Sequence, residues 1–100
     1  MIIVSQNKDE IVNFDNITNI MITDCDGDFV ISAVALVGVD DVYRELGYYT
    51  TERRAKEILK EITQKYIHIP YKKYGNDYIK QNQVYEMPKE WKKNGKTNNM

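Results

Sequence analysis

Aromatic and basic side chains alternate over residues 65–91 in a pattern that could bind a nucleotide. The aromatic residues are Tyr66, Tyr71, Tyr74, Tyr78, Tyr85 and Trp91, and the basic ones are Lys65, His68, Lys72, Lys73 and Lys80. Aromatic rings can stack on bases while cations neutralise phosphates, so this composition suits a nucleotide or single-stranded nucleic acid. The alternative is that the tyrosines pack against the core or a dimer partner, with their hydroxyl groups in water.

Three aspartates and the histidine could in principle bind a metal ion, but a structural role explains them better. Three carboxylates surround Gly27, those of Asp24, Asp26 and Asp28, and hard cations such as calcium prefer oxygen ligands. Their order differs from the calcium-loop pattern and the closing bidentate glutamate is missing, so a hairpin turn is the better interpretation. His68, the only histidine, has no recognisable partner ligand, and we expect it to be a partly buried structural residue.

The chain carries no recognisable catalytic motif. Its five glycines are scattered singly, so no phosphate-binding loop is present, and no serine or cysteine nucleophile lies in a known motif beside the histidine. This pattern does not support an NTPase or a nucleotide-dependent oxidoreductase. We therefore expect a protein that binds rather than catalyses, with no cofactor and no metal.

The composition is that of one ordinary globular domain. The chain has 100 residues, of which 42% are hydrophobic and 29% charged. We expect a single α+β domain over residues 1–88 and a loosely ordered polar tail over residues 89–100. Because a core of this size leaves stability marginal, we also expect a homodimer or a larger homo-oligomer.

Charge is divided unevenly along the chain. Residues 1–50 hold nine acidic and two basic residues, while residues 51–100 hold six acidic and twelve basic ones. The two halves can attract each other within the fold or across a dimer, or the basic half can meet an anionic partner. Both interpretations stay open.

The sequence favours a reducing compartment away from membranes. We find no signal peptide pattern, and no stretch approaches the roughly 20 apolar residues of a membrane span. Cys25 is the only cysteine, so no intramolecular disulfide is possible. We expect a protein that is neither exported nor inserted into a membrane, and a Cys25 that lies in a polar turn and is dispensable.

Strand formers and turn residues predict an N-terminal antiparallel β-sheet. The expected strands cover residues 2–5, 10–14, 17–23, 29–37 and 42–49. Asp26-Gly27 is a favoured pair for a two-residue hairpin turn, because both residues tolerate positive φ. The third and fourth strands should therefore pair with each other.

One main amphipathic helix is expected over residues 52–66, packed on that sheet. Thr50 or Thr51 can cap it. Its apolar stripe recurs with helical spacing and consists of Ala55, Ile58, Leu59, Ile62 and Tyr66. Beyond it, Pro70 and Gly75-Asn76 interrupt any regular element. We expect an irregular, aromatic-rich C-terminal segment with one short strand over residues 84–87.

Three stretches of the chain resemble a group of short phage and prophage proteins of Firmicutes. They are the opening IIVSQNKDEIVNFDNI, the passage GYYTTERRAKEILKEI and the closing VYEMPKE, together about a third of the chain. The organisation is also similar to that of the phage Thoeris anti-defence sponges, which join an N-terminal antiparallel sheet to C-terminal helical segments and form dimers or larger oligomers. Those sponges sequester cyclic ADP-ribose isomers made by bacterial TIR-domain immunity enzymes.

The resemblance implies a phage anti-defence protein that holds a cyclic nucleotide signal, a cyclic ADP-ribose isomer, in the host cytoplasm without cleaving it. Its partner would be this free signal rather than nucleic acid. Arg54 matches the arginine of the group's T-E-x-R-A-K-E motif and would bind the diphosphate. Arg53 departs from the motif, which more often has an acidic residue there. The other implied ligand contacts are Tyr71, Lys73, Tyr74, Asn76 and Asn82.

Two other classes of function stay open. The protein could directly inhibit a host defence nuclease or nucleic-acid complex, with its acidic half mimicking nucleic acid. It could instead be a phage accessory protein whose surface mediates assembly. Retention of a cyclic nucleotide by the purified protein would separate the first class from these two.

Overall fold

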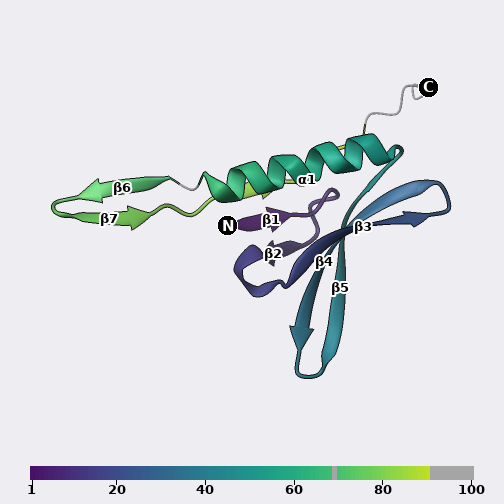
Figure 1. Ribbon diagram of the computed structural model, residues 1–100, viewed down its shortest axis with the longest axis horizontal. Coiled ribbons are helices and arrows are strands. Elements are labelled where there is room, and N and C mark those ends of the chain that lie inside the picture. Colours follow the sequence, from purple (N-terminus) through teal and green to yellow (C-terminus); the bar gives the residue numbers. More distant parts are fainter. Residues whose placement is uncertain (69, 91–100) are drawn as a thin grey trace.

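The computed structural model describes residues 1–68 and 70–90 as an α+β fold, the class predicted from the sequence (Figure 1). A 3-10 turn, Phe14–Asn16, follows the second strand. The elements are β1 Ile2–Val4, β2 Ile11–Asn13, β3 Asn19–Cys25, β4 Asp28–Val37, β5 Asp40–Tyr49, α1 Glu52–Ile67, β6 Tyr71–Tyr74, β7 Asp77–Lys80 and β8 Val84–Glu86. Most of the tail expected over residues 89–100 lies outside the described residues.

The larger sheet has the order β3-β4-β5 and is antiparallel throughout. Asp26 and Gly27, with φ of 53° and 91°, form the two-residue turn between β3 and β4 that the sequence predicts. The register shifts between Ile31 and Ser32, which leaves Leu46 as an extra residue on β5, a β-bulge.

A smaller sheet joins the two ends of the chain. Its order is β2-β1-β8, with β1 and β2 forming the predicted N-terminal hairpin. β8 confirms the short strand expected near residues 84–87, and it pairs parallel to β1, so that Ile3 lies between Val12 and Tyr85. This pairing ties the C-terminal segment to the start of the chain.

Helix α1 begins as the sequence predicts. The side chain of Thr51 caps it by accepting a hydrogen bond from the backbone N–H of Arg54 at 3.1 Å. Ala55, Ile58 and Ile62 of the apolar stripe are buried. Tyr66, the last residue of the stripe, is less buried. It is 40% exposed, and its ring packs on Phe14 with the ring centroids 4.7 Å apart.

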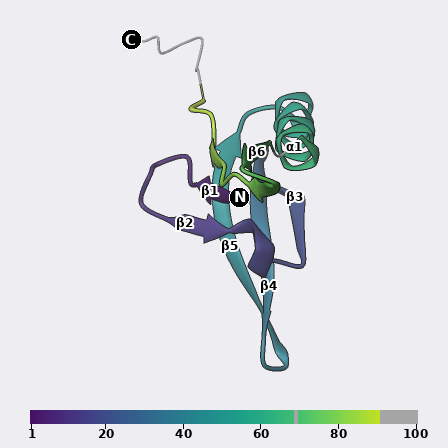
Figure 2. The ribbon, with the colours of Figure 1, turned by 90° about the vertical axis from the view of Figure 1, so that its left-hand side faces the viewer.

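The core lies where the helix covers one face of the larger sheet and meets the smaller sheet (Figure 2). We call this face of β3-β4-β5 the inner face, since Ile31, Ala33 and Tyr49 point from it into the core. The other buried core residues are Met1, Ile3, Val12, Leu46, Ala55, Ile58, Ile62, Tyr85 and Met87. No helix of the described residues has the length and apolar character needed to cross a membrane.

Two local expectations are wrong. The segment expected to be irregular contains a regular hairpin, β6–β7, because Gly75 adopts φ of 61° at the first central position of a two-residue turn. His68 is exposed rather than partly buried. It ends helix α1, and its ring Nδ1 lies 2.8 Å from the carbonyl oxygen of Gln64, which also accepts a hydrogen bond from the backbone N–H of His68 at 3.1 Å.

Cys25→Ser is expected to change the free energy of unfolding by only a few tenths of a kcal/mol. Cys25 ends β3 beside the Asp26-Gly27 turn, and its side chain is exposed, as predicted. Chemical denaturation followed by circular dichroism measures the difference. A loss above roughly 2 kcal/mol would contradict the surface position of this thiol.

Candidate functional site

The β6–β7 hairpin holds most of the residues predicted to contact a ligand, and it extends beyond the C-terminal end of α1 (Figure 1). Its cross-strand pairs are Tyr71 with Lys80, Lys72 with Ile79, Lys73 with Tyr78 and Tyr74 with Asp77. Successive residues of a strand point to opposite faces, so the hairpin has two different surfaces.

We call the first surface the basic face; it consists of Tyr71, Lys73, Tyr78 and Lys80. Each tyrosine lies opposite a lysine, and there is no carboxylate among the four residues. The ammonium group of Lys73 lies 5.8 Å from the ring centroid of Tyr78. This face offers flat rings for stacking and two cations for phosphate, which is the chemistry of a nucleotide-binding surface.

We call the second surface the mixed face; it consists of Lys72, Tyr74, Asp77 and Ile79. Its two charges cancel, and the ammonium group of Lys72 lies 5.6 Å from the ring centroid of Tyr74. Of the predicted ligand contacts, Tyr71 and Lys73 share the basic face, whereas Tyr74 lies on the mixed face and Asn76 lies in the turn. Asn82 is exposed in the segment between β7 and β8.

Tyr78 and Lys80 complete the basic face, but neither was among the predicted ligand contacts. The signal was present in the sequence. Reading Gly75-Asn76 as a two-residue hairpin turn fixes the register of the flanking strands, and the alternation of strand residues then assigns all eight side chains to faces.

Arg53 and Arg54 lie at the opposite end of α1 from the hairpin. Ile67 comes thirteen positions after Arg54 in the helix, which is about 20 Å along the axis. Arg54 is also engaged within the chain, because its guanidinium lies 3.4 Å from a carboxylate oxygen of Glu57 and 3.6 Å from one of Glu61. Within one chain, the structure does not bring the arginines together with the hairpin residues.

Two buried tyrosines lie near Arg54. The hydroxyl of Tyr85 donates a hydrogen bond to Glu61 at 2.7 Å, and that of Tyr49 donates to the carbonyl oxygen of Pro88 at 2.7 Å. Burial is the main cause that raises the pKa of Tyr49, to about 12, and it also raises the pKa of Tyr85, together with the hydrogen bond to Glu61. Both phenols therefore stay neutral at physiological pH and serve the core.

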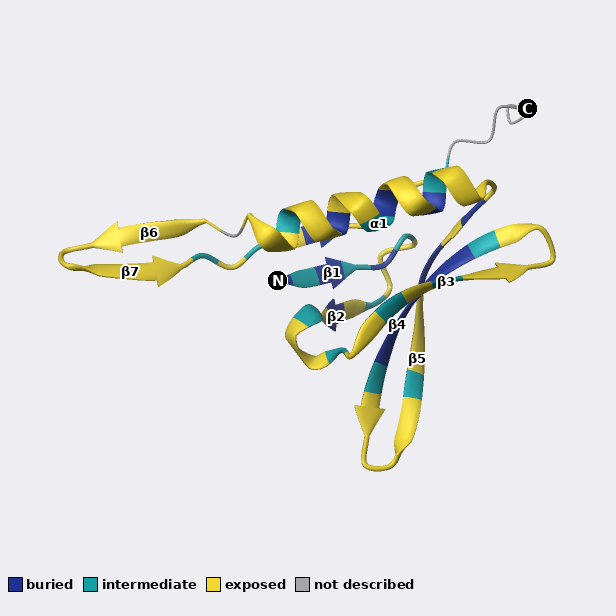
Figure 3. Ribbon diagram, viewed as in Figure 1, coloured by how far each residue is buried: buried dark blue, intermediate teal, exposed yellow. Residues whose placement is uncertain are grey.

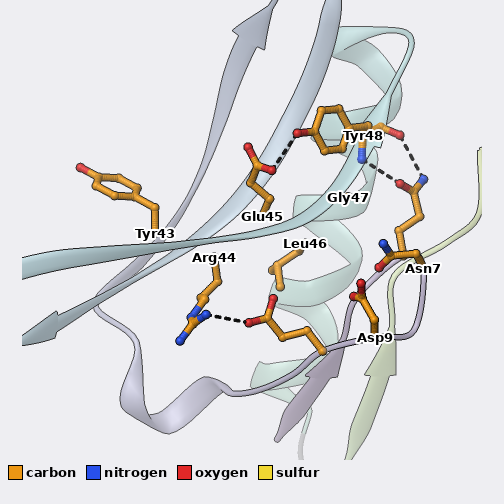
Figure 4. A pocket seen from close by; sticks show the side chains of 10 residues that line it. Asn7, Asp9, Tyr43, Arg44, Glu45, Leu46, Gly47 and Tyr48 are labelled. Carbon is orange, nitrogen blue, oxygen red and sulfur yellow. Dashed lines mark hydrogen bonds and ion pairs between the residues drawn. The ribbon is translucent and has the colours of Figure 1, made fainter.

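A groove of about 460 Å³ runs along β5, between this strand and the loop of residues 6–10 (Figure 4). The side chain of Gln6 bonds both backbone groups of Tyr48, accepting from its N–H at 2.8 Å and donating to its carbonyl oxygen at 3.0 Å. The hydroxyl of Tyr48 donates to Glu45, and this hydrogen bond raises the pKa of Tyr48.

The charges of this groove do not suit an anion. Arg44 is its one arginine, and it pairs with Glu10 at 3.2 Å. Asp9 and Glu45 add further carboxylates. A nucleotide diphosphate would be repelled here, so the groove is better understood as the contact that holds the N-terminal loop to β5.

The face of β3-β4-β5 turned away from the helix, which we call the outer face, is acidic. Its three described strands contribute no lysine or arginine to it. Along β4, Val30 and Val34 are only 3% and 4% exposed. Tyr48 lies beside Val30, and Tyr43, which is 60% exposed, lies beside Val34. The carboxylates of the outer face are those of Asp28, Asp41 and Glu45.

In residues 1–68 and 70–90, no three histidine, cysteine or acidic side chains lie close enough to hold a metal ion together. Asp24, one of the residues considered for calcium, accepts a hydrogen bond from the backbone N–H of Gly27 at 3.2 Å and so supports the hairpin turn. Comparisons of the chain with protein-family models, curated proteins and solved structures find no match.

Proposed function

We propose that the protein binds an anionic nucleotide signal and holds it without cleaving it, as a phage anti-defence protein acting in the host cytoplasm. The observation that carries this proposal is the basic face of the β6–β7 hairpin, where two exposed tyrosines alternate with two lysines. Stacking on an aromatic ring contributes about 1 to 3 kcal/mol per base, and lysines supply the countercharge for phosphate.

A cyclic ADP-ribose isomer fits the two kinds of contact that this face offers. The adenine can stack on Tyr78 or Tyr71, and the diphosphate can lie between Lys73 and Lys80. The resemblance to the Thoeris anti-defence sponges supports the same ligand class. Sequestration needs affinity and no turnover, so it requires no nucleophile or general base beside the ligand.

Lys73→Ala and Tyr78→Ala are each expected to weaken binding of a cyclic ADP-ribose isomer. The lysine change should cost about 1 kcal/mol, or about fivefold in Kd, because the ion contact is exposed. The tyrosine change should cost about 1 to 3 kcal/mol. Titration calorimetry with a panel of cyclic ADP-ribose isomers measures both, and mass spectrometry of the released ligand should show it chemically unchanged.

Lys72→Ala is the matched control, since it removes the same charge from the neighbouring residue on the mixed face. It should leave the affinity for the ligand unchanged within about twofold. Equal losses for Lys72→Ala and Lys73→Ala would mean that net charge, not the basic face, attracts the ligand. If no ligand of the panel produces heat with the wild-type protein, the proposed function is wrong.

Arg54→Ala tests whether the helix contributes to the same site. If Arg54 binds the diphosphate, as the resemblance implies, the loss should be about 1.5 to 3 kcal/mol, or from about tenfold to more than a hundredfold in Kd. The apolar stripe is untouched, so the fold should survive. Because Arg54 lies far from the hairpin of its own chain, losses for both Arg54→Ala and Lys73→Ala would require a pocket formed by two chains. An unchanged Kd would restrict the site to the hairpin.

A second candidate function is direct inhibition of a defence nuclease or nucleic-acid complex. The acidic outer face favours it, because three carboxylates around an apolar centre resemble what a basic, nucleic-acid-binding surface accepts. In host cells with a nuclease-based defence, Asp41→Lys should then abolish protection while Lys73→Ala retains it. The reverse pattern, in cells with a signal-based defence, would favour sequestration.

A further inference from the structure

The rest of the chain leaves the apolar side chains of the β6–β7 hairpin exposed. All eight strand residues are exposed, and the hairpin stands apart from both sheets (Figure 3). On the mixed face, Tyr74 and Ile79 are each 50% exposed. A two-stranded hairpin is at best marginally stable alone in water, so a surface that packs against it would stabilise it.

The four residues of the mixed face form a two-by-two grid. Lys72 lies opposite Ile79, and Tyr74 lies opposite Asp77. The positive and negative charges therefore occupy opposite corners, and the two apolar side chains occupy the other two. This arrangement is self-complementary, as an interface between identical copies must be.

Only one orientation of two facing hairpins pairs opposite charges and also places apolar side chains on apolar side chains. A two-fold axis along the diagonal from Tyr74 to Ile79 places Lys72 of each copy over Asp77 of the other, and sets Tyr74 and Ile79 on their own equivalents. An axis along or across the strands places both charges over apolar side chains. An axis along the other diagonal places like charges together. The favoured orientation crosses the strands at about a right angle, a known packing of sheets.

We propose that the mixed face is an interface between two copies of this chain, related by a two-fold axis through Tyr74 and Ile79. Two Lys72–Asp77 ion pairs flank a centre formed by the two tyrosines and the two isoleucines. The basic faces of both hairpins then point outward and remain open. The interface does not depend on the proposed function, because it uses the opposite side of the hairpin.

The size of the interface sets its strength. Four residues per copy bury far less than the roughly 1,600 Å² of a standard stable complex. The dimer should therefore dissociate on dilution, with a Kd in the micromolar to millimolar range. Added salt should weaken it, since the ion pairs are exposed.

Charge reversal tests the pairing. Lys72→Asp gives two copies that each present two carboxylates, and Asp77→Lys gives copies that each present two ammonium groups. Analytical ultracentrifugation should show each variant alone dimerising at least about tenfold more weakly than the wild type. An equimolar mixture of the two variants should dimerise again, because every contact in it joins opposite charges. The double variant Lys72→Asp/Asp77→Lys should also recover.

Cysteine crosslinking tests the axis. In a Cys25→Ser background, Ile79→Cys places two thiols on the two-fold axis, and mild oxidation should give a covalent dimer. Tyr78→Cys is the matched control. Residue 78 is the neighbour of residue 79, but its side chain lies on the basic face, so this cysteine should crosslink poorly. Equal crosslinking of both variants, or a wild-type protein that stays monomeric up to millimolar concentration, would overturn the proposal. So would charge-reversal variants that dimerise like the wild type.

Discussion

Gly47→Ala is expected to lower the free energy of unfolding by about 2 to 3 kcal/mol, a large share of the stability of a small domain. A Cβ at residue 47 would lie 2.8 Å from the hydroxyl oxygen of Tyr49 and 2.9 Å from a carbon of its ring. These distances are too short for unstrained contacts, so either the strand or the ring must move. Chemical denaturation followed by circular dichroism measures the loss.

The ring of Tyr49 has little freedom to move away. It is fully buried, and its hydroxyl donates to the carbonyl oxygen of Pro88. The control is the same alanine in a Tyr49→Phe background, which removes the oxygen nearest to the new Cβ. The alanine should be less destabilising there than in the wild type. A wild-type loss below about 0.5 kcal/mol would show that the sheet adapts at no strain.

Locally specified parts of the fold could be predicted from the sequence. The Asp26-Gly27 turn needs only two residues that tolerate positive φ, and helix α1 needs only Thr51 as its cap and an apolar stripe of period 3.6. The hairpin of residues 71–80 was equally local. An interruption at Gly75 is the wrong interpretation, because glycine at that position forms a hairpin turn.

Features that depend on contacts distant in sequence could not be predicted. The parallel pairing of β8 with β1 places Glu86 opposite Val4, and no sequence pattern in either segment predicts this pairing. The bulge at Leu46 depends on the register between β4 and β5. Gly47 owes its importance to the path of the Tyr49 ring, which the tertiary structure alone determines.

The structure separates the predicted ligand contacts into two groups, and the sequence could not show this for the same reason. The resemblance implies Arg54, Tyr71 and Lys73 as contacts of one ligand, but a sequence motif contains no distances between such residues. The helix between them is straight and about 20 Å long over this stretch, which places the two groups at opposite ends. In contrast, the alternation within β6 and β7 was sufficient to separate the basic face from the mixed face.

The free energy of unfolding is expected to fall steeply between pH 10 and pH 12. An unperturbed tyrosine loses its proton near pH 10, whereas burial raises the pKa of Tyr49 to about 12 and also raises that of Tyr85. Above pH 10 the unfolded chain releases these protons and the folded chain keeps them, so rising pH stabilises the unfolded state. Tyr49 alone should account for a loss of about 2 to 3 kcal/mol over this interval.

Phenylalanine variants isolate each phenol in urea titrations carried out at several pH values. Tyr49→Phe and Tyr85→Phe should each reduce the slope of stability against pH by up to one proton, which is about 1.4 kcal/mol per pH unit. Tyr85→Phe leaves Glu61 with Arg54 as a partner at 3.6 Å, so the carboxylate keeps a countercharge. The plots of the free energy of unfolding against pH should therefore differ in slope between the wild type and the variants. Parallel plots from pH 10 to pH 12 would contradict the raised pKa of these two groups. Neutral buried phenols would then not be the cause of alkaline unfolding.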